Sequence, residues 1–224
     1  MSKRTALRPT PPTPDSGSSS QLPVTYLSAI PAGVLAGARL IGFATGVVVP
    51  AGVLSQLGYG AYNFHPGPPA YPGLCPAQLA VYDAATEFGV TAHKMVARVD
   101  AGPIVGTILF PVRPGSNVHD VELAAFTRLM QLFWQLAPLL ADDPEPLGDL
   151  PLAWGTRRSS RRTLRTMCEI PLDIAAYELD RRIGAFGQTP FDIVPTITLH
   201  GYRFRLVPEI AERTAEQQPL AATG

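Results

Sequence analysis

Charge and cysteine are scarce in this sequence, and each scarcity excludes a class of protein. Only 16% of the 224 residues are charged, and 18 lysines and arginines balance 18 acidic residues. No net charge therefore draws the chain to nucleic acid or to anionic lipid. The two cysteines, Cys75 and Cys168, lie far apart without CxxC or Cys/His ligand spacing, so they indicate neither a disulfide framework nor a zinc site.

Long hydrophobic runs are also missing. The most apolar stretch, residues 40–54, is shorter than the roughly 20 residues needed to cross a bilayer, and Pro50 and glycines interrupt it. Residues 1–21 carry positive charge but no continuous apolar core, so they are not a secretory signal. Their proline, serine and threonine bury little surface, which favours disorder. We expect a soluble protein of the reducing cytoplasm with no membrane partner.

The apolar content that is present, 46% of residues, is enough for one domain with a short appendage. Residues 23–28 and 40–49 are apolar without polar alternation, as in parallel strands covered on both faces. Residues 31–39 suit a short helix or turn, Pro50 can begin another helix, and residues 60–64 suit a third strand. This alternation of strands and helices predicts an α/β fold with an open, mostly parallel, Rossmann-like sheet.

The middle of the chain predicts a helix at residues 77–87 and two strands at 90–99 and 104–112. Asp100-Ala101-Gly102-Pro103 joins these strands with residues typical of turns. Residues 117–140 have apolar positions at three- and four-residue spacings, which predict a long helix that Ser116 can cap. After an acidic, proline-containing linker, we expect a helix at residues 173–186 and a β-hairpin that turns at His200-Gly201.

Three polar residues have the chemistry of acyl transfer. Alternation along a strand places Asn63 and His65 on one side and Phe64 on the other. A carboxamide can stabilise an oxyanion, a histidine can move a proton near neutral pH, and a carboxylate such as Asp100 can fix its tautomer or hold a relaying water. Spacing alone is weak evidence, because a lone loop histidine is more commonly a surface or backbone-bonded residue. For His93, beside Thr91, we expect a structural role.

The surrounding motifs are more specific than these residues alone. In order along the chain they are Tyr62-Asn63-Phe64-His65-Pro66-Gly67, Tyr71-Pro72-Gly73, Cys75-Pro76-Ala77, Gly89-Val90-Thr91 and Asp100-Ala101-Gly102-Pro103-Ile104. Over residues 40–112 this series resembles the formyltransferase family, which includes methionyl-tRNA, glycinamide-ribonucleotide and sugar-nucleotide N-formyltransferases. The resemblance implies that Asn63, His65 and Asp100 are catalytic and that 10-formyltetrahydrofolate is the formyl donor.

The same resemblance implies where the donor binds. The backbone of Val47, Val48 and Val49 would offer hydrogen bonds to the pterin, and the turn containing Ala97 and Val99 would close the pocket. A flat heterocycle suits apolar walls with a few backbone donors and acceptors. The valines fit a plain strand core equally well.

The sequence departs from the family pattern in the region that would bind the acceptor. Members usually begin with a Gly-containing strand–loop–helix that binds the acceptor's phosphate; only about sixty residues precede Asn63, so we expect an early βα unit to be missing. The loop after His65 lacks the basic residue that tRNA-acting members often carry. Five arginines form a basic cluster that can pair with phosphates or RNA, although a solvated face is the reading we favour: Arg157, Arg158, Arg161, Arg162 and Arg165.

We therefore expect formyl transfer to a small-molecule amine, such as a nucleotide sugar or an amino-acid-derived metabolite, and do not favour tRNA. Hydrolysis of 10-formyltetrahydrofolate and a non-catalytic folate- or partner-binding remnant are the alternatives. The C-terminal helix and hairpin could support a homodimer or cover the active site. The expected divisions are a tail at 1–21, a catalytic domain at 22–141, a linker at 142–165, the helix and hairpin at 166–208, and a tail at 209–224.

Overall fold

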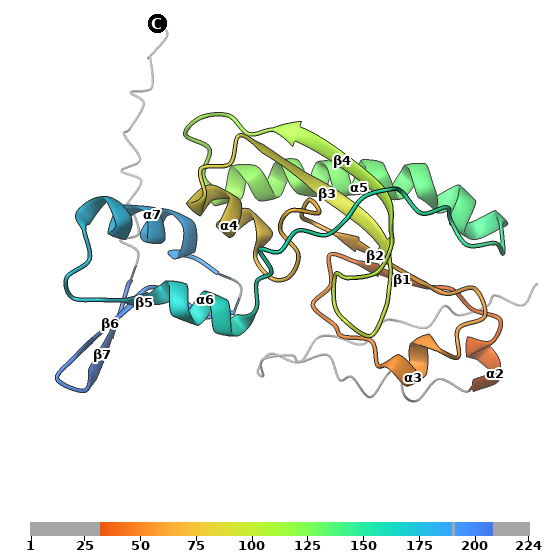
Figure 1. Cartoon of the computed structure of the whole chain (residues 1–224), viewed down its shortest axis with the longest axis horizontal. Helices are drawn as coiled ribbons and strands as arrows, with labels where there is room; N and C mark the ends of the chain where they lie inside the picture. Colours follow the sequence, from red (N-terminus) through yellow and green to blue (C-terminus); the bar gives the residue numbers. More distant parts are fainter. Residues whose placement is uncertain (1–31, 190, 208–224) are drawn as a thin grey trace, which may run out of the picture.

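A computed structural model describes residues 32–189 and 191–207 of the chain. The expected tails at residues 1–21 and 209–224 and the expected strand at 23–28 lie outside the described residues. In the described part, a long helix lies along one face of a central sheet, and a smaller group of helices and strands lies at one end (Figure 1).

The central sheet has four strands in the order β1-β2-β3-β4. Its strands are β1 (Leu40–Phe43), β2 (Ala61–His65), β3 (Glu87–Lys94) and β4 (Ile104–Pro111). β1 and β2 are parallel, whereas β2–β3 and β3–β4 are antiparallel. The predicted α/β class is confirmed, but the sheet is mixed, and the expectation of mostly parallel strands is wrong. The apolar run at residues 40–49 contributes β1, which is parallel to β2, whereas β3 and β4 follow each other through a short connection that pairs strands antiparallel.

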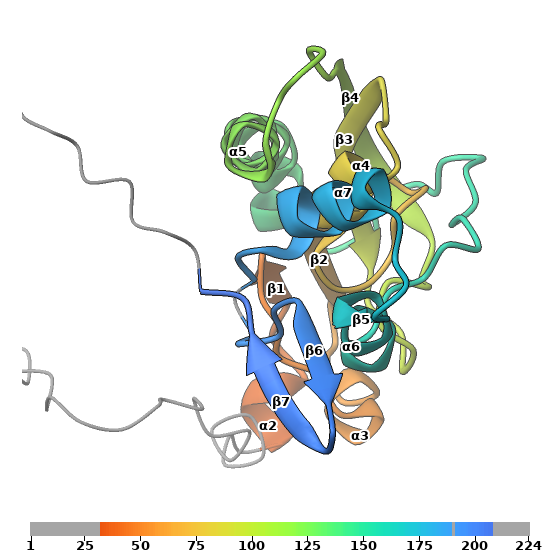
Figure 2. The ribbon, with the colours of Figure 1, turned by 90° about the vertical axis from the view of Figure 1, so that its left-hand side faces the viewer.

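The long helix α5 (Val118–Asp142) covers one face of this sheet, as the two views show (Figures 1 and 2). Asn117, and not the predicted Ser116, caps it: its side chain accepts from the backbone N–H of Asp120, and Asp120 accepts from the backbone N–H of Asn117. One stripe of the helix is buried against the sheet, which follows from its three- and four-residue apolar spacing: Val121, Ala125, Leu129, Leu132 and Leu140.

The predicted strand at residues 40–49 ends early. β1 stops at Phe43 because Ala44 has a positive φ of 46°, which a strand cannot contain. Residues 44–49 continue as irregular chain to the short helix α3 (Ala51–Leu54), which Pro50 precedes as expected. Another short helix, α2 (Ala32–Leu35), lies within the predicted range of 31–39. The Ala44 N–H still donates to the Phe64 carbonyl of β2, whereas residues 45–49 are released from sheet pairing. Within this segment the Val47 N–H donates to Thr45 Oγ1.

A second hydrophobic cluster joins the C-terminal elements to the sheet domain. It contains Cys75, Leu79, Leu164, Cys168, Ala185 and Phe186. These side chains come from α4 (Pro76–Tyr82) and its N-cap, α6 (Arg161–Cys168) and α7 (Ala176–Phe186). The small sheet beside them consists of β5 (Glu169–Ile170), β6 (Thr196–Leu199) and β7 (Tyr202–Arg205). The hairpin and α7 agree with the sequence prediction, whereas α6 and β5 were not predicted.

The helices in the described part of the chain are too short or too polar to cross a membrane.

Candidate active site

The end of β2 presents Asn63 and His65 to a cavity on one side of the sheet. Phe64, between them, is fully buried in the main core with Tyr62. This is the alternation predicted from the sequence. His65 is only 4% exposed, so the cavity receives a histidine that bulk water scarcely reaches.

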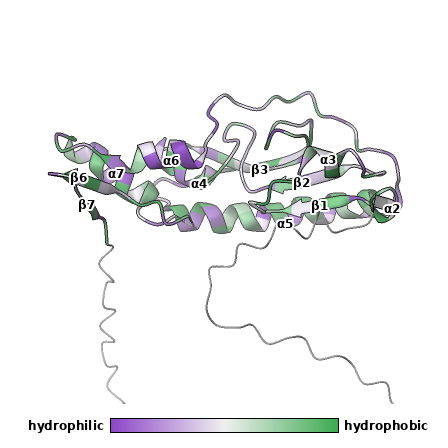
Figure 3. Cartoon of the chain, turned by 90° about the horizontal axis from the view of Figure 1, so that it is seen from below, coloured by the Kyte–Doolittle hydropathy of each residue, from purple (hydrophilic) through white to green (hydrophobic). Residues whose placement is uncertain are grey.

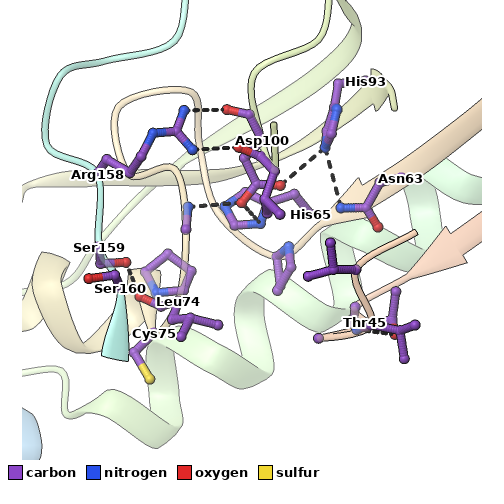
Figure 4. Close-up of a pocket in the computed structure, with 18 of the residues that line it drawn as sticks. Thr45, Asn63, His65, Leu74, Cys75, His93, Asp100, Arg158, Ser159 and Ser160 are labelled. Atoms are coloured by element: carbon purple, nitrogen blue, oxygen red, sulfur yellow. Dashed lines mark hydrogen bonds and ion pairs between the residues drawn. The ribbon is translucent and has the colours of Figure 1, made fainter. Parts of the chain in front are cut away.

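Asp100 reaches the same place from the turn between β3 and β4 (Figure 4). It adopts a positive φ of 44° and is buried, and aspartate is among the few side chains that tolerate this conformation. Its Oδ2 accepts a hydrogen bond of 2.8 Å from the backbone N–H of Gly73 and lies 3.6 Å from Nδ1 of His65. The structure therefore brings the three predicted residues Asn63, His65 and Asp100 to one site.

Gly73 can donate to Asp100 only because it is glycine. Its φ is +104°, a region that L side chains rarely adopt, and a Cβ there would lie 2.2 Å from the carbonyl oxygen of Ser159. The loop after His65 is thus fitted closely to the segment that carries Ser159. The carboxylate of Asp100 is held from outside its own turn.

His65 is oriented by a backbone carbonyl. Its Nε2 lies 3.1 Å from the Tyr71 carbonyl oxygen, and because a carbonyl can only accept, Nε2 carries a proton. Nδ1 then faces Asp100 at 3.6 Å, which is beyond hydrogen-bond distance. Burial lowers the pKa of His65 below its usual value, while the nearby negative charge of Asp100 partly offsets this. The imidazole is therefore predominantly neutral at pH 7.

His93 is a member of the site that sequence reasoning assigned to structure alone. Its Nδ1 lies 2.9 Å from the Lys94 carbonyl oxygen, and its Nε2 lies 3.2 Å from Asp100 Oδ1 and 3.3 Å from Asn63 Nδ2 (Figure 4). His93 thus links the carboxylate to the carboxamide. His93 reaches the site because it lies directly opposite Asn63 in the antiparallel pairing of β2 and β3. The sequence motifs around Asn63 and His93 do not determine which residues of the two strands pair.

The Asp100 carboxylate remains ionised despite its burial. Desolvation alone would raise its pKa, but the hydrogen bond with His93, the charge of His65 and the Gly73 N–H together hold the pKa below its usual value. A stable negative charge 3.6 Å from His65 favours the protonated form of that imidazole, which partly offsets the effect of burial on its pKa.

Residues 143–160, expected as part of a linker, are attached along the sheet domain. Trp154 donates from Nε1 to the Gly102 carbonyl at 2.8 Å, and its ring lies edge-on to His65 and His93, with centroids 5.9 and 5.1 Å apart. Arg158 donates to the carbonyls of Val99 and Asp100. Trp154 and Arg158 thus fix the Asp100 turn, and sequence reasoning missed both functions because the contacts span more than fifty residues.

The cavity has a volume of about 810 Å³ and mostly apolar walls. All five residues predicted to contact the donor line it: Val47, Val48, Val49, Ala97 and Val99. Val47 and Val48 are exposed by 40% and 56%, so these two valines are not the plain strand core that was the alternative. Apolar walls with released backbone groups suit a flat heterocycle.

The buried cysteines are not suited to nucleophilic chemistry. Burial raises the pKa of Cys75, which lines the cavity, to about 12 and that of Cys168 to about 11. Both are therefore neutral thiols at pH 7. Within residues 32–189 and 191–207, no group of histidine, cysteine and acidic side chains is arranged to hold a metal ion.

The mixed sheet, its covering helix and the Asn–His–Asp site define a formyltransferase-type α/β fold. A 4-N formyltransferase from Francisella tularensis superposes with a TM-score of 0.63 at 20% identity, covering 80% of this chain and 74% of that one. An N-formyltransferase from Helicobacter canadensis, solved with folinic acid and dTDP-3-aminofucose, gives a TM-score of 0.51 at 17% identity over 70% of this chain and 56% of that one. These likenesses confirm the predicted fold.

Residues 40–128 match the sequence profile of the formyl transferase family, so the predicted family resemblance is confirmed for this segment. A methionyl-tRNA formyltransferase from Xanthomonas oryzae is 29% identical over 180 residues, which cover 79% of this chain. The chain spans 56% of the length of that relative. Asn63, His65, His93 and Asp100 all lie within the matched segment, while Trp154 and Arg158 lie beyond it.

Proposed function

We propose that the protein transfers a formyl group from 10-formyltetrahydrofolate to an amine. The observation that carries the proposal is the convergence of Asn63, His65 and Asp100 on one wall of an apolar cavity of about 810 Å³. The family match over residues 40–128 supports the reaction class. The presence of folinic acid in the Helicobacter canadensis structure supports a reduced folate as donor.

Val47, Val48 and Val49 would hold the donor's ring system through their backbone, and Ala97 and Val99 would close over it. When bound, the donor supplies an activated formyl carbon attached to nitrogen. Transfer forms a bond between that carbon and the acceptor nitrogen and breaks the original carbon–nitrogen bond. The acceptor amine loses one proton and the leaving nitrogen gains one, so the chain must stabilise an oxyanion and move a proton.

Asn63 is suited to the oxyanion. Its Nδ2 carries two hydrogens and lies 3.3 Å from His93 Nε2. The Oδ1 of the same amide is buried without a hydrogen-bond partner among the described residues. The hydrogen-bonding capacity of the amide is therefore not fully used by the protein. A donor prepositioned in a site of low dielectric stabilises developing charge strongly.

His65 is suited to proton movement because burial keeps it neutral at pH 7. Asp100 favours the imidazolium that forms when His65 accepts the amine's proton, and the imidazolium can then return the proton to the leaving nitrogen. Of the two roles expected for Asp100, holding a relaying water fits better than tautomer fixing. The Tyr71 carbonyl already sets the proton on Nε2.

A small amine is the acceptor we favour. The loop at residues 66–73 contains no lysine or arginine, and its Gly67 carbonyl accepts a buried hydrogen bond from Thr91. Arg157 is paired with Asp83, and Arg158 is occupied by backbone carbonyls. Two of the five arginines of the basic cluster are thus committed within the protein, which weakens the case for a long RNA partner.

The test is formyl transfer by purified variants. We expect His65→Ala to lower kcat by roughly 10²- to 10⁴-fold and Asn63→Ala by roughly 10²- to 10³-fold, because each removes one element of transition-state stabilisation. Asp100→Asn should also lower kcat. Circular dichroism and folinic acid titration serve as controls for folding and donor binding.

Turnover that is unchanged in His65→Ala or Asp100→Asn would refute the assigned roles. Formate release that needs no amine would instead identify a 10-formyltetrahydrofolate hydrolase. Folinic acid binding without turnover across a panel of amines would identify a folate-binding protein that lacks catalysis.

A further inference from the structure

A second, polar groove lies between α6 and the C-terminal sheet. Its volume is about 510 Å³, and its lining includes Arg165 from α6 and Arg203 and Arg205 from β7. Successive residues of a strand point to opposite faces, so Arg203 and Arg205 share one face of β7. Figure 2 shows α6 beside β5 and β6, with β7 completing the sheet.

The groove adjoins the active-site cavity. Phe191 lines both spaces, and α6 connects them because Arg161 lines the cavity and Arg165 lines the groove. Four residues of helix separate these positions by about 6 Å along the axis. Arg161 also stacks on Phe191, with its guanidinium carbon 5.3 Å from the ring centroid. A ligand longer than the cavity can therefore extend into the groove.

The positive charge of the groove is only partly neutralised by the protein. Arg205 pairs with Asp192, and Glu169 is the remaining acidic residue of the lining. Among the described residues, neither Arg165 nor Arg203 has a carboxylate within ion-pair distance. Figure 3 shows α6 coloured as a hydrophilic element.

The arrangement costs stability. Arg161 and Arg165 are four residues apart on one helix, Arg162 and Arg165 are three apart, and α6 contains no acidic residue. Like charges at these spacings destabilise a helix. A bound anion would relieve this repulsion, and guanidinium groups bind phosphate oxygens with two parallel hydrogen bonds.

We propose that this groove binds a phosphate or pyrophosphate group of the amine acceptor, with Arg165 and Arg203 as its ligands. The proposal rests on the proposed formyl transfer and names the class of acceptor: an amine joined to a phosphate, with the amine in the cavity beside Asn63 and the phosphate in the adjoining groove. Two unpaired guanidinium groups suit one compact phosphate group, whereas a nucleic acid chain needs a longer row of cations.

Inorganic pyrophosphate titrated into the full chain tests the groove by calorimetry. Arg165→Gln and Arg203→Gln should each weaken binding by about tenfold, because each removes a charge-assisted pair. Arg162→Gln is the matched control: it removes the same charge from the same helix, and Arg162 lines neither space. Its affinity should remain within about twofold of the native value.

Equal weakening in all three variants would overturn the proposal, because it would indicate a diffuse charge effect. Absence of pyrophosphate binding by the native chain would also overturn it. A short RNA that binds more tightly than pyrophosphate, and is weakened equally by Arg162→Gln, would replace the small acceptor with a nucleic acid. Folinic acid titrated in parallel tests the donor cavity separately, so failure of the groove and failure of the proposed reaction give different results.

Discussion

At the scale of single residues, the proposed chemistry depends on how His65 and Asp100 share charge. His65 is buried, which lowers its pKa, and Asp100 is the main influence that raises it again. Asp100 in turn is held ionised by His93, by His65 and by the Gly73 N–H. The titrations of His65 and Asp100 are therefore coupled, and a substitution of one should shift the pKa of the other.

We expect kcat/KM to fall at acidic pH with a midpoint below 6.5, because the neutral form of His65 is the active base and its pKa is lowered. In Asp100→Asn the negative charge that favours the imidazolium is lost. The acidic limb should therefore move to still lower pH, together with a lower maximum rate. A pH series of kcat/KM measures both effects, and a limb that moves upward in Asp100→Asn would contradict the account.

Some residues of the candidate site could be predicted from the sequence and others could not. Asn63, His65 and Asp100 could be predicted because each lies inside a local motif or at a strand end. His93 could not, because its function arises from pairing opposite Asn63 in an antiparallel register. Trp154 and Arg158 could not either, since their contacts with Gly102, Val99 and Asp100 join segments distant in sequence.

At the scale of elements, β1 supports the site through close packing against β2. Gly42 on β1 is the direct partner of Asn63. A Cβ at Gly42 would lie 2.8 Å from Asn63 Oδ1 and 2.7 Å from Met95 Cε. Glycine at position 42 thus leaves space for the Asn63 amide, which we propose is catalytic.

Gly42→Ala should therefore displace the Asn63 amide and lower kcat by about tenfold or more, while the fold persists, because one oxyanion donor leaves its position. Gly52→Ala is the control, since a Cβ at Gly52 meets nothing within 4 Å. Formyl-transfer kinetics and thermal unfolding of both variants provide the comparison. Native turnover in Gly42→Ala would mean that Asn63 does not need this packing.

Some helices and strands could be predicted from sequence patterns, whereas others depend on contacts between distant segments. Apolar periodicity predicted α5, because this helix buries one regular stripe, and the turn residues His200-Gly201 predicted the C-terminal hairpin. It did not predict α6, whose eight residues include three arginines, nor the end of β1 at Ala44. The segment expected as a linker supplies Trp154 and Arg158, so we propose that the functional catalytic unit extends beyond residue 141 to at least residue 158.

At the scale of the whole molecule, α4 joins two hydrophobic clusters. Ala77 and Ala80 belong to the cluster between the sheet and α5, and Leu79 belongs to the cluster with α6 and α7. The cavity lies along this junction, with residues 44–49 on one side and Arg161 and Phe191 on the other. We therefore propose that donor and acceptor enter the cavity from different sides of this junction.

A structure of the full chain with folinic acid tests the central claim most directly. We expect the pterin to lie against the backbone of residues 47–49, with the formyl-bearing end of the ligand beside Asn63 and His65. Folinic acid bound elsewhere, or a cavity that excludes it at saturating concentration, would contradict the assignment of this cavity as the formyl-donor site.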